Sequence, residues 1–480
     1  MAEWWTVHTQ SGSRLLPGDP QQTGAELRAE FRSVFEREAA GVWFAPGRAN
    51  LNGEHIDFHG GRCLPMALSH GTYVTAAPRE DGVLRLRTLD PGLDDGVRTV
   101  TMHEIRPLTS AARPSPEQNA GNPSVREDEE PVPPGDSSGL NDDWTRYVSG
   151  VLWSLQQLGR ERSEFAVPEG FGADLLVSST LPIGGGLSSS AALECASMLA
   201  FVALATPAGA AHPQTSLNTA LTDEHRALLA RACMRAEVEV VGAGTGGLDQ
   251  TVSLRGAAGH LLALDCRDFS VEQLPLEPLL REHTFLAVDT GQAHWLGDGK
   301  FGARRADAES AAELLGLQRL RDALPQEPSP DDVDHVLAEF DRLAAGLEDS
   351  ASEVVEPKVW RRRLQHALTE MVRSEQLRRL LAEPAGEAAE PAAQIGAIMA
   401  EGHSSMREDA EVSFELADQV VETACSAGAL GARLIGGGFG GSVLTLLPRR
   451  ATDEVLDAVS ALSPGIRVLE PVPSAPARAL

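Results

Sequence analysis

Acids, histidines and an arginine combine with several glycines in residues 45–61 (APGRANLNGEHIDFHGG). Carboxylates accept strong hydrogen bonds from neutral hydroxyl groups, and glycine lets the backbone turn sharply and approach a ligand closely. Any one of these residues alone fits a polar surface loop, but for the whole cluster we favour a site that binds a molecule with several hydroxyl groups. Its polar members are Arg48, Glu54, His55, Asp57 and His59.

A second stretch, residues 179–200 (STLPIGGGLSSSAALECASMLA), follows a strand-like segment at 173–178 and combines a glycine-rich loop, three serines and a helix-forming run. Free N–H groups and the positive dipole end at the start of a helix form an anion site. No GxxxxGK[ST] pattern is present, so this is not a Walker-type loop. A tight turn with small residues for packing is the alternative, but the combination favours a phosphate site.

Two acids lie in residues 236–254 (AEVEVVGAGTGGLDQTVSL), around a glycine-rich bend. Phosphoryl transfer needs a positioned nucleophile, a metal ion and neutralisation of charge. Asp249 could take a proton from a substrate hydroxyl, Glu237 could hold Mg²⁺ with a loop serine, and Arg48 could stabilise developing negative charge. The alternative makes Glu237 a solvated helix residue and Asp249 a turn former.

A third glycine-rich stretch, residues 434–447 (LIGGGFGGSVLTLL), places five glycines around Phe439 just before an apolar run. Such a loop can contact a bound ligand or can cross another element closely. The stretch alone does not separate these two interpretations.

Composition narrows the class of protein. The chain has 480 residues and a formal net charge of −28, so a broad surface for a nucleic-acid backbone is disfavoured. The longest apolar run, 197–207, is too short to span a bilayer, and no signal peptide is visible. Five widely spaced cysteines without a CxxC pair argue against a disulfide framework and a thiolate metal site. We expect a soluble cytoplasmic protein with a small-molecule partner.

Strands and helices mix along the chain. Strands are expected at 83–88, 173–178 and 284–288, and helices at 303–324 and 413–427, the last ended by Gly428. Residues 107–142 are rich in proline, glycine, serine and acids, and we interpret them as a disordered insertion. The pattern predicts an α/β or α+β protein of about two lobes.

The three glycine-rich motifs and the Leu-Asp-Gln string at Asp249 resemble those of the GHMP kinase superfamily, and most closely the galactokinase family. Residues 45–61 resemble the galactokinase signature, 179–200 the ATP loop, and 434–447 the C-terminal glycine motif. The resemblance implies an α+β fold with an N-terminal mixed α/β lobe, residues 20–270, and a C-terminal ferredoxin-like lobe, residues 271–470. The active site would lie in the cleft between them.

The resemblance also implies a role for each matching residue. Asp249 would be the catalytic base acting on the C1 hydroxyl of galactose, and Arg48 would stabilise the transition state. The sugar-binding positions would be Glu54, His55, Ile56, Asp57 and Phe301. The loop around the ATP phosphates would be Gly184, Gly185, Gly186, Leu187, Ser188, Ser189 and Ser190, with Thr88 near the nucleotide. Mg²⁺ would lie at Ser190 and Glu237.

The sequence departs from the family pattern at the sugar end. Ile56 replaces a threonine, Phe58 a tyrosine and His59 an asparagine, and Phe301 replaces a tyrosine that contacts the sugar. A hydrogen bond lost there costs ~1–3 kcal/mol if its partner stays buried. A related kinase for N-acetylgalactosamine, another hexose, a pentose or a cyclitol is therefore an alternative. A non-catalytic galactose sensor is disfavoured, because such relatives lack the Ser-Ala pair kept here at Ser190.

Overall fold

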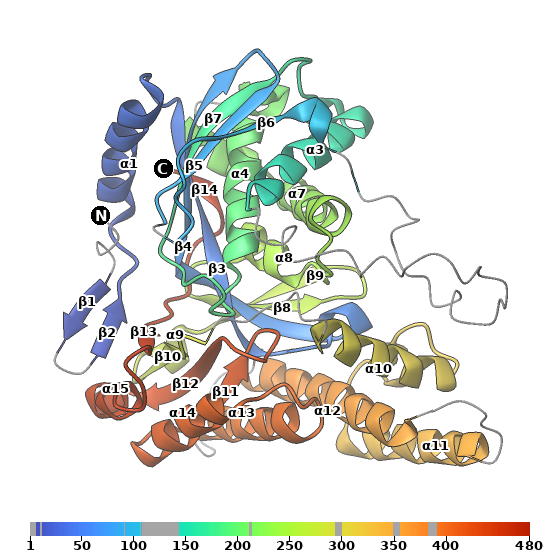
Figure 1. Cartoon of the computed structure of the whole chain (residues 1–480). Helices are drawn as coiled ribbons and strands as arrows, with labels where there is room; N and C mark the ends of the chain where they lie inside the picture. Colours follow the sequence, from blue (N-terminus) through green and yellow to red (C-terminus); the bar gives the residue numbers. More distant parts are fainter. Residues whose placement is uncertain are drawn as a thin grey trace, which may run out of the picture.

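The computed structural model arranges the chain as two lobes, one above the other in the view of Figure 1. The described residues are 6–9, 12–90, 92–105, 107, 144–210, 214–292, 300–348, 356–382 and 391–480. The proposed insertion at 107–142 lies outside them, apart from Pro107. None of the described helices combines the length and the apolar character needed to cross a lipid bilayer.

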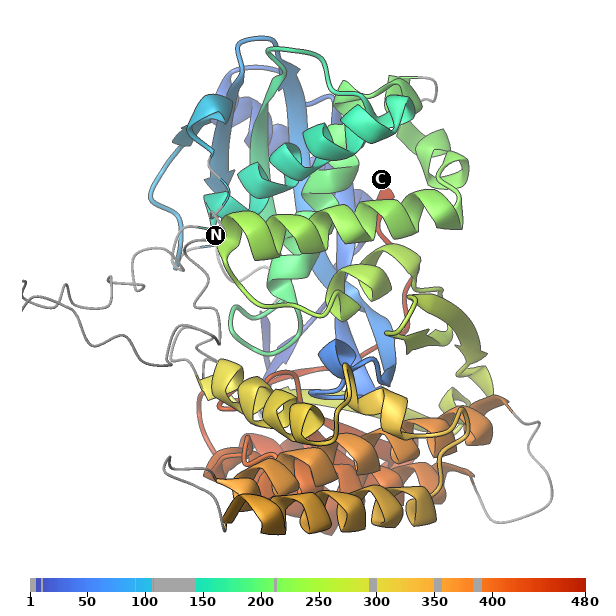
Figure 2. The ribbon, with the colours of Figure 1, turned by 90° about the vertical axis from the view of Figure 1, so that its right-hand side faces the viewer.

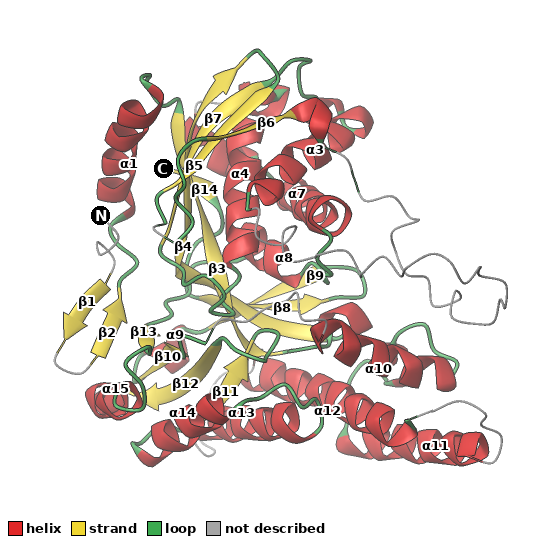
Figure 3. Ribbon diagram, viewed as in Figure 1, coloured by secondary structure: helices red, strands yellow, loops and turns green. Residues whose placement is uncertain are grey.

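The upper lobe is built on an eight-stranded sheet (Figure 3). Its main path runs β14-β3-β4-β7-β5-β6, with β8 paired to β4 and β9 paired to β8. The strands are β3 (Gly41–Asn52), β4 (Arg62–Arg79), β5 (Val83–Thr88), β6 (Arg98–Thr101), β7 (Gly172–Ser179), β8 (His260–Asp265), β9 (Ser270–Pro275) and β14 (Arg478–Ala479). Trp43 and Phe44 lie in different apolar clusters, because successive side chains of a strand point to opposite faces.

Helices cover both faces of this sheet (Figures 1 and 2). The first helix, α1 (Pro20–Phe35), packs on one face, and α4 (Ser189–Ala205) packs on β3 and β4 from the other. Most residues of α4 are apolar and buried, as expected of a helix inside a core. The remaining helices of this lobe are α3 (Thr145–Glu161), α5 (Pro207–Ala210), α6 (Gln214–Ala220), α7 (Asp223–Ala236), a π-helix (Glu237–Val241) and α8 (Leu248–Arg255).

The lower lobe holds a six-stranded sheet of order β1-β2-β13-β10-β12-β11. Its strands are β1 (Thr6–Thr9), β2 (Gly12–Leu15), β10 (His283–Asp289), β11 (Gly431–Ile435), β12 (Ser442–Pro448) and β13 (Arg467–Leu469). The last four form a βαββαβ unit with the fourth strand beside the first, which confirms the expected ferredoxin-like lobe. The hairpin β1-β2 extends this sheet, because β2 pairs with β13 in parallel.

A helical layer completes the lower lobe (Figure 2). Its helices are α9 (Glu277–Leu280), α10 (Lys300–Leu314), α11 (Pro330–Glu348), α12 (Pro357–Ala382), α13 (Pro391–Glu408), α14 (Glu415–Ser426) and α15 (Thr452–Ser460). The long helix α12 packs on α10, α11 and α13 and also contacts β3, β4 and β9 of the upper lobe. It therefore joins the two lobes.

Most expected elements are present. β5, β7 and β10 contain the strands predicted at 83–88, 173–178 and 284–288, and α14 is followed by Gly428 as predicted. The helix predicted over 303–324 is wrong in its length, because α10 ends at Leu314. Gly316 follows with a φ of 69°, which does not continue a right-handed helix, and only a 3₁₀ turn at Leu320–Ala323 comes after it.

Candidate active site

Arg48 and Asp249 form an ion pair. The Arg48 Nε atom lies 2.9 Å from Oδ1 of Asp249, and Nη2 donates to Oδ2 at 3.3 Å. Asp249 is the second residue of α8, which begins after Gly247 with a φ of 82°. Arg48 follows a shift in the register of β3 against β4 at Gly47. A Cβ at Gly47 would lie 2.5 Å from the carbonyl oxygen of Leu187, so only glycine fits there.

This ion pair is bonded to the glycine-serine loop. The Ser188 hydroxyl donates to Oδ2 of Asp249 at 2.5 Å, and Nη1 of Arg48 donates to the carbonyl oxygen of Gly186 at 2.5 Å. The Asp249 side chain is 26% exposed, whereas that of Arg48 is 9% exposed. The structure thus brings together the proposed base, the proposed arginine and the proposed phosphate loop, with the carboxylate still reachable from solvent.

The glycine-serine loop connects the end of β7 to the start of α4. Gly184 and Gly186 adopt positive φ values of 69° and 71°, and Ser188, before the helix, has a φ of 60°. No side chain of the N-cap residue closes the first turn of α4. Its backbone N–H groups are therefore available to an anion, and Ser189 and Ser190 lie in the same turn.

The third glycine motif crosses this loop closely. The Ser442 hydroxyl donates to the carbonyl oxygen of Gly185 at 2.6 Å. A Cβ on Gly186 would lie 3.2 Å from the carbonyl oxygen of Ile435, and a Cβ on Gly436 would lie 3.1 Å from that of Gly186. Of the two interpretations of residues 434–447, close crossing of another element is the one seen here.

Glu237 is buried beside the ion pair and is not a solvated helix residue, since its exposure is 6%. It begins the π-helix after α7, and the Gln250 amide donates to its Oε2 at 2.5 Å. The same amide donates to Oε2 of Glu194 at 2.9 Å, on α4. Burial raises the pKa of Glu237 to about 7, and the charge of Asp249 adds to this shift.

The surroundings of Glu237 fit a magnesium ion. Ser190 lies one helical turn before Glu194, so both fall on the same side of α4. Oε1 of Glu194 and Oε1 of Gln250 are buried without a hydrogen-bond partner. In the part of the chain that the structure describes, no cluster of three or more His, Cys, Asp or Glu side chains is arranged to hold a metal. In proteins, Mg²⁺ is usually held by one or two carboxylates together with substrate phosphates.

Glu54 lies deep in the signature loop, with 2% exposure. The backbone N–H of Gly436 donates to its Oε1 at 2.6 Å, and the Asn50 amide donates to its Oε2 at 2.6 Å. Burial raises the pKa of Glu54 to about 7, although Arg433 and Arg48 oppose the shift. Each carboxylate oxygen has two lone pairs, so the Glu54 carboxylate can still accept a hydrogen bond from a substrate hydroxyl.

Asp57 and His55 belong to the same signature loop as Glu54. Burial, together with the nearby charge of Asp249, raises the pKa of Asp57 to about 6. Gly246 packs against this carboxyl so closely that a Cβ there would lie 2.1 Å from Oδ2. His55 has a φ of 61°, and its Nε2 lies 3.0 Å from the carbonyl oxygen of Gly437. The ring of Phe301 lies 4.9 Å from that of His55, so these proposed sugar contacts are neighbours.

Three other residues singled out from the sequence, Ile56, His59 and Thr88, are also buried. Ile56 is fully buried and packs on Gly61, so only its backbone is left to contact a substrate. Burial, with Arg305 nearby, lowers the pKa of His59 to about 3. Thr88 ends β5, which runs parallel to β7, so it lies at the sheet edge from which the phosphate loop departs. Its hydroxyl accepts from the N–H of Asp90 at 3.1 Å.

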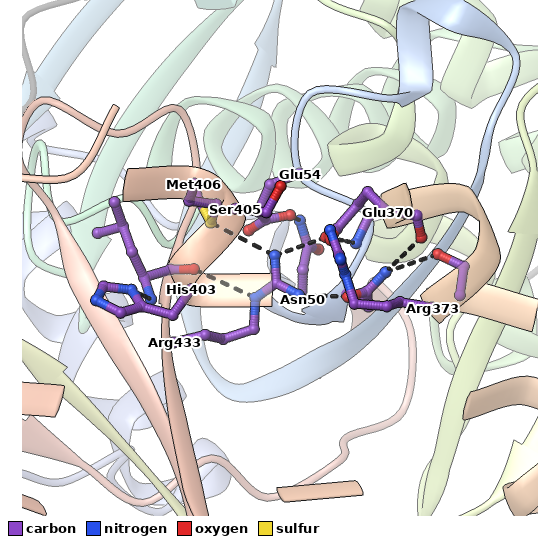
Figure 4. A network of polar contacts seen from close by, with 12 residues as sticks. Asn50, Glu54, Glu370, Arg373, His403, Ser405, Met406 and Arg433 are labelled. Carbon is purple, nitrogen blue, oxygen red and sulfur yellow. Dashed lines mark hydrogen bonds and ion pairs between the residues drawn. The ribbon is translucent and has the colours of Figure 1, made fainter. Parts of the chain in front are cut away.

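The sequence analysis missed a buried polar network around the signature, drawn in Figure 4. Its main members are His366 and Glu370 on α12 and Arg433 on β11. A signal was available, because His366, Glu370 and Ser374 recur every fourth residue and so share one face of a helix. Nothing in that spacing reveals which distant segment the face contacts.

Three family models match the chain: a galactokinase galactose-binding signature at residues 29–78, a GHMP kinase N-terminal domain at 146–257 and a GHMP kinase C-terminal domain at 385–464. The first covers the signature loop, and the second covers the phosphate loop, Glu237 and Asp249. The crystal structure of Lactococcus lactis galactokinase complexed with galactose superposes with a TM-score of 0.68 at 24% identity, covering 95% of this chain and 99% of that one. It shows that the fold is shared.

Curated relatives match over nearly the whole length. The galactokinase of Streptomyces coelicolor is 38% identical over 94% of this chain and 97% of its own length. The human galactokinase is 31% identical over 90% of each chain. The ferredoxin-like lobe and the glycine-serine loop bonded to Asp249 and Arg48 agree with these matches. The chain therefore belongs to the galactokinase family of GHMP kinases.

Proposed function

We propose that this sugar kinase transfers the γ-phosphoryl group of ATP to the C1 hydroxyl of α-D-galactose, giving α-D-galactose 1-phosphate and ADP. The observation that carries the proposal is the contact of the Arg48–Asp249 pair with both Gly186 and Ser188 of the phosphate loop. A base placed against the phosphate loop is the arrangement that phosphoryl transfer to a hydroxyl requires, since such catalysis consists of positioning and charge stabilisation.

In the proposed reaction Asp249 accepts the proton of the C1 hydroxyl as the oxygen attacks the γ-phosphorus. A carboxylate within hydrogen-bond reach of that hydroxyl serves as a general base. Arg48 holds Asp249 in place and supplies positive charge next to the transferring group. The N–H groups at the start of α4 and the hydroxyls of Ser188, Ser189 and Ser190 bind the phosphates.

Ser190 and Glu237 would hold Mg²⁺. When bound, the ion neutralises charge on the β- and γ-phosphate oxygens. The Gln250 amide, which donates to both Glu237 and Glu194, fixes the position of the Glu237 carboxylate beside α4. Support comes from the oxygen donors, the unpartnered Oε1 atoms of Glu194 and Gln250, and the burial of Glu237.

At the sugar end, Glu54, His55 and Asp57 would accept and donate hydrogen bonds to hydroxyl groups. Phe301 and Phe58, whose rings lie beside His55, would cover an apolar face of the sugar. We also propose a cytoplasmic location, because the five cysteines are free and the thiols of Cys63 and Cys266, 3.9 Å apart, share a hydrogen bond and not a disulfide.

The test is ADP release by the purified protein across a panel of sugars. We expect galactose to give the highest kcat/KM. One second candidate, a kinase for a substituted sugar such as N-acetylgalactosamine, is favoured by the departures from the family pattern at Ile56, His59 and Phe301. Turnover of N-acetylgalactosamine, a pentose or a cyclitol with none of galactose would reject the galactose assignment.

A further inference from the structure

One face of α12 holds the backbone of the sugar signature. The Oε1 atom of Glu370 accepts the N–H of Gly53 at 2.9 Å. The Asn52 amide donates both to the carbonyl oxygen of Glu370 at 3.0 Å and to the Ser374 hydroxyl at 2.8 Å. One turn earlier, Nε2 of His366 lies 3.1 Å from the carbonyl oxygen of Glu54. The face thus contacts three consecutive residues of the loop.

Arg433 joins this contact from β11. Its Nη2 donates to Oε1 of Glu370 at 2.6 Å, and its Nη1 donates to Oδ1 of Asn52 (Figure 4). Both side chains of the Arg433–Glu370 ion pair are fully buried, with 0% exposure. On the other side of the carboxylate, Arg373 donates to Oε2 at 3.0 Å. Every partner of this pair is therefore protein, which suits a charge kept away from water.

The segment that carries Arg433 also contacts Glu54. Three residues after Arg433, the N–H of Gly436 donates to Oε1 of Glu54. The guanidinium fits tightly, because a Cβ on Gly402 would lie 2.5 Å from its Nη1. A shift of Arg433 would thus be transmitted to the carboxylate of Glu54.

The signature backbone needs such a clamp. Gly53 has a φ of 115° and His55 a φ of 61°, both in the left-handed region. A non-glycine residue in that region costs free energy and persists only when its surroundings hold it there. The contacts of Glu370 and Asn52 lie directly before His55 and supply that restraint.

We propose that Arg433 and Glu370 are a positioning pair, which holds residues 52–54 in the sugar-binding conformation and so sets affinity for the sugar. Neither residue can contact a sugar, because both are fully buried. The inference rests on the proposed function, in which Glu54 and His55 bind sugar hydroxyls. It assigns to two residues of the second lobe a role in the sugar affinity of a loop in the first.

The experiment compares Glu370→Gln and Arg433→Lys with wild-type enzyme in steady-state kinetics for galactose and for ATP. Glu370→Gln keeps the size of the side chain and removes its charge, whereas Arg433→Lys keeps the charge and loses the forked guanidinium that bonds both Glu370 and Asn52. We expect KM for galactose to rise about tenfold or more, with KM for ATP and kcat changed by about twofold at most. Ser374→Ala removes one weaker contact and should raise KM for galactose by about threefold, which keeps the test usable if the buried-charge variants fold poorly.

The matched control is Asp174→Asn. Asp174 is equally buried and is bonded by Arg85 at 2.6 and 2.8 Å, but lies near the start of β7, at the end away from the phosphate loop. It should lower the melting temperature and leave KM for galactose unchanged. Variants of Glu370, Arg433 and Ser374 that lower the melting temperature without raising KM for galactose would overturn the proposal. Wild-type enzyme that does not turn over galactose would instead reject the function on which it rests.

Discussion

The phosphate end of the site and its sugar end are built differently. At the proposed phosphate end, the contacts of Arg48, Ser188 and Asp249 lie within the first lobe, and Ser442 of the second lobe adds one bond, to Gly185. At the sugar end, Glu54 is bonded to Gly436, 382 positions later, and Asn52 to Arg433, 381 positions later. The second lobe therefore bonds the carboxylate and backbone of the proposed sugar loop, whereas the Arg48–Asp249 pair of the proposed phosphate end is bonded within the first lobe.

The residues that depart from the family pattern lie at one of these two ends. The departures Ile56, Phe58, His59 and Phe301 all fall at the sugar end, whereas Arg48, Asp249 and the serines follow the family pattern. Substitutions at the phosphate end should therefore reduce kcat, and substitutions at the sugar end should act on stability and KM.

The largest effect is expected from Asp249→Asn. An amide cannot accept the proton of the C1 hydroxyl, so kcat should fall by about 10²–10⁴-fold. The affinity for ATP, followed by titration with a fluorescent ATP analogue, should stay within about twofold, since the phosphate loop is unchanged. A fully active variant would contradict the assignment of Asp249 as base.

The next effect is expected from Gly47→Ala. The added methyl group would lie 2.5 Å from the carbonyl oxygen of Leu187 and 2.8 Å from the side chain of Leu181, so β3 must shift at Arg48. Misplacing a catalytic group by less than 1 Å should lower kcat by about 10–100-fold. Gly24→Ala is the matched control, because no atom lies within 4 Å of the new methyl group and kcat should not change. Equal activity of the two variants would show that Arg48 needs no such precise placement.

A smaller effect concerns pH and the carboxyl of Glu54, whose pKa is raised to about 7 by burial, although the charges of Arg433 and Arg48 oppose the shift. A folded pKa above the unfolded one stabilises the protein at low pH, and this stability is lost as pH rises through the folded value. As pH rises from about 5.5 to about 8, ionisation of Glu54 should lower the free energy of unfolding by about 2 kcal/mol.

Glu54→Gln should abolish that part of the pH dependence, measured by denaturant unfolding of the sugar-free protein at both pH values. Glu454→Gln, at an exposed position of α15, serves as the control and should leave the dependence as in wild type. An unchanged dependence in Glu54→Gln would mean that Glu54 is ionised throughout this range.

The smallest effect is expected from Phe301→Tyr. Phe301 lies against His55, and a tyrosine would restore the hydroxyl that the family usually presents there. One added hydrogen bond should lower KM for galactose by about 2–10-fold, with kcat unchanged. Phe58→Tyr tests whether any added hydroxyl does the same. A rise in KM for galactose together with better use of another sugar would favour the alternative substrate.

Several features could be predicted from the sequence because they are local. The strands at 83–88, 173–178 and 284–288 follow from short apolar patterns, and the turn into α4 follows from glycine and serine chemistry. The resemblance assigned Asp249 and Arg48 to one active site, but their ion pair is seen only in the structure. The length of α10 was missed, because an alanine- and leucine-rich run continues past Gly316, where the backbone turns.

Sequence by itself determined which residues could do chemistry: a carboxylate base, an arginine, hydroxyls and a flexible loop for phosphates, and an acidic loop for a sugar. Tertiary structure alone decided that Glu237 is buried, that Ile56 points into the core, and that α12 and β11 clamp the signature. The physical reason is the distance along the sequence over which each effect acts. Propensity and periodicity act over a few residues, whereas the burial of Glu370 with Arg433 depends on how two lobes, assembled from distant segments, pack against each other.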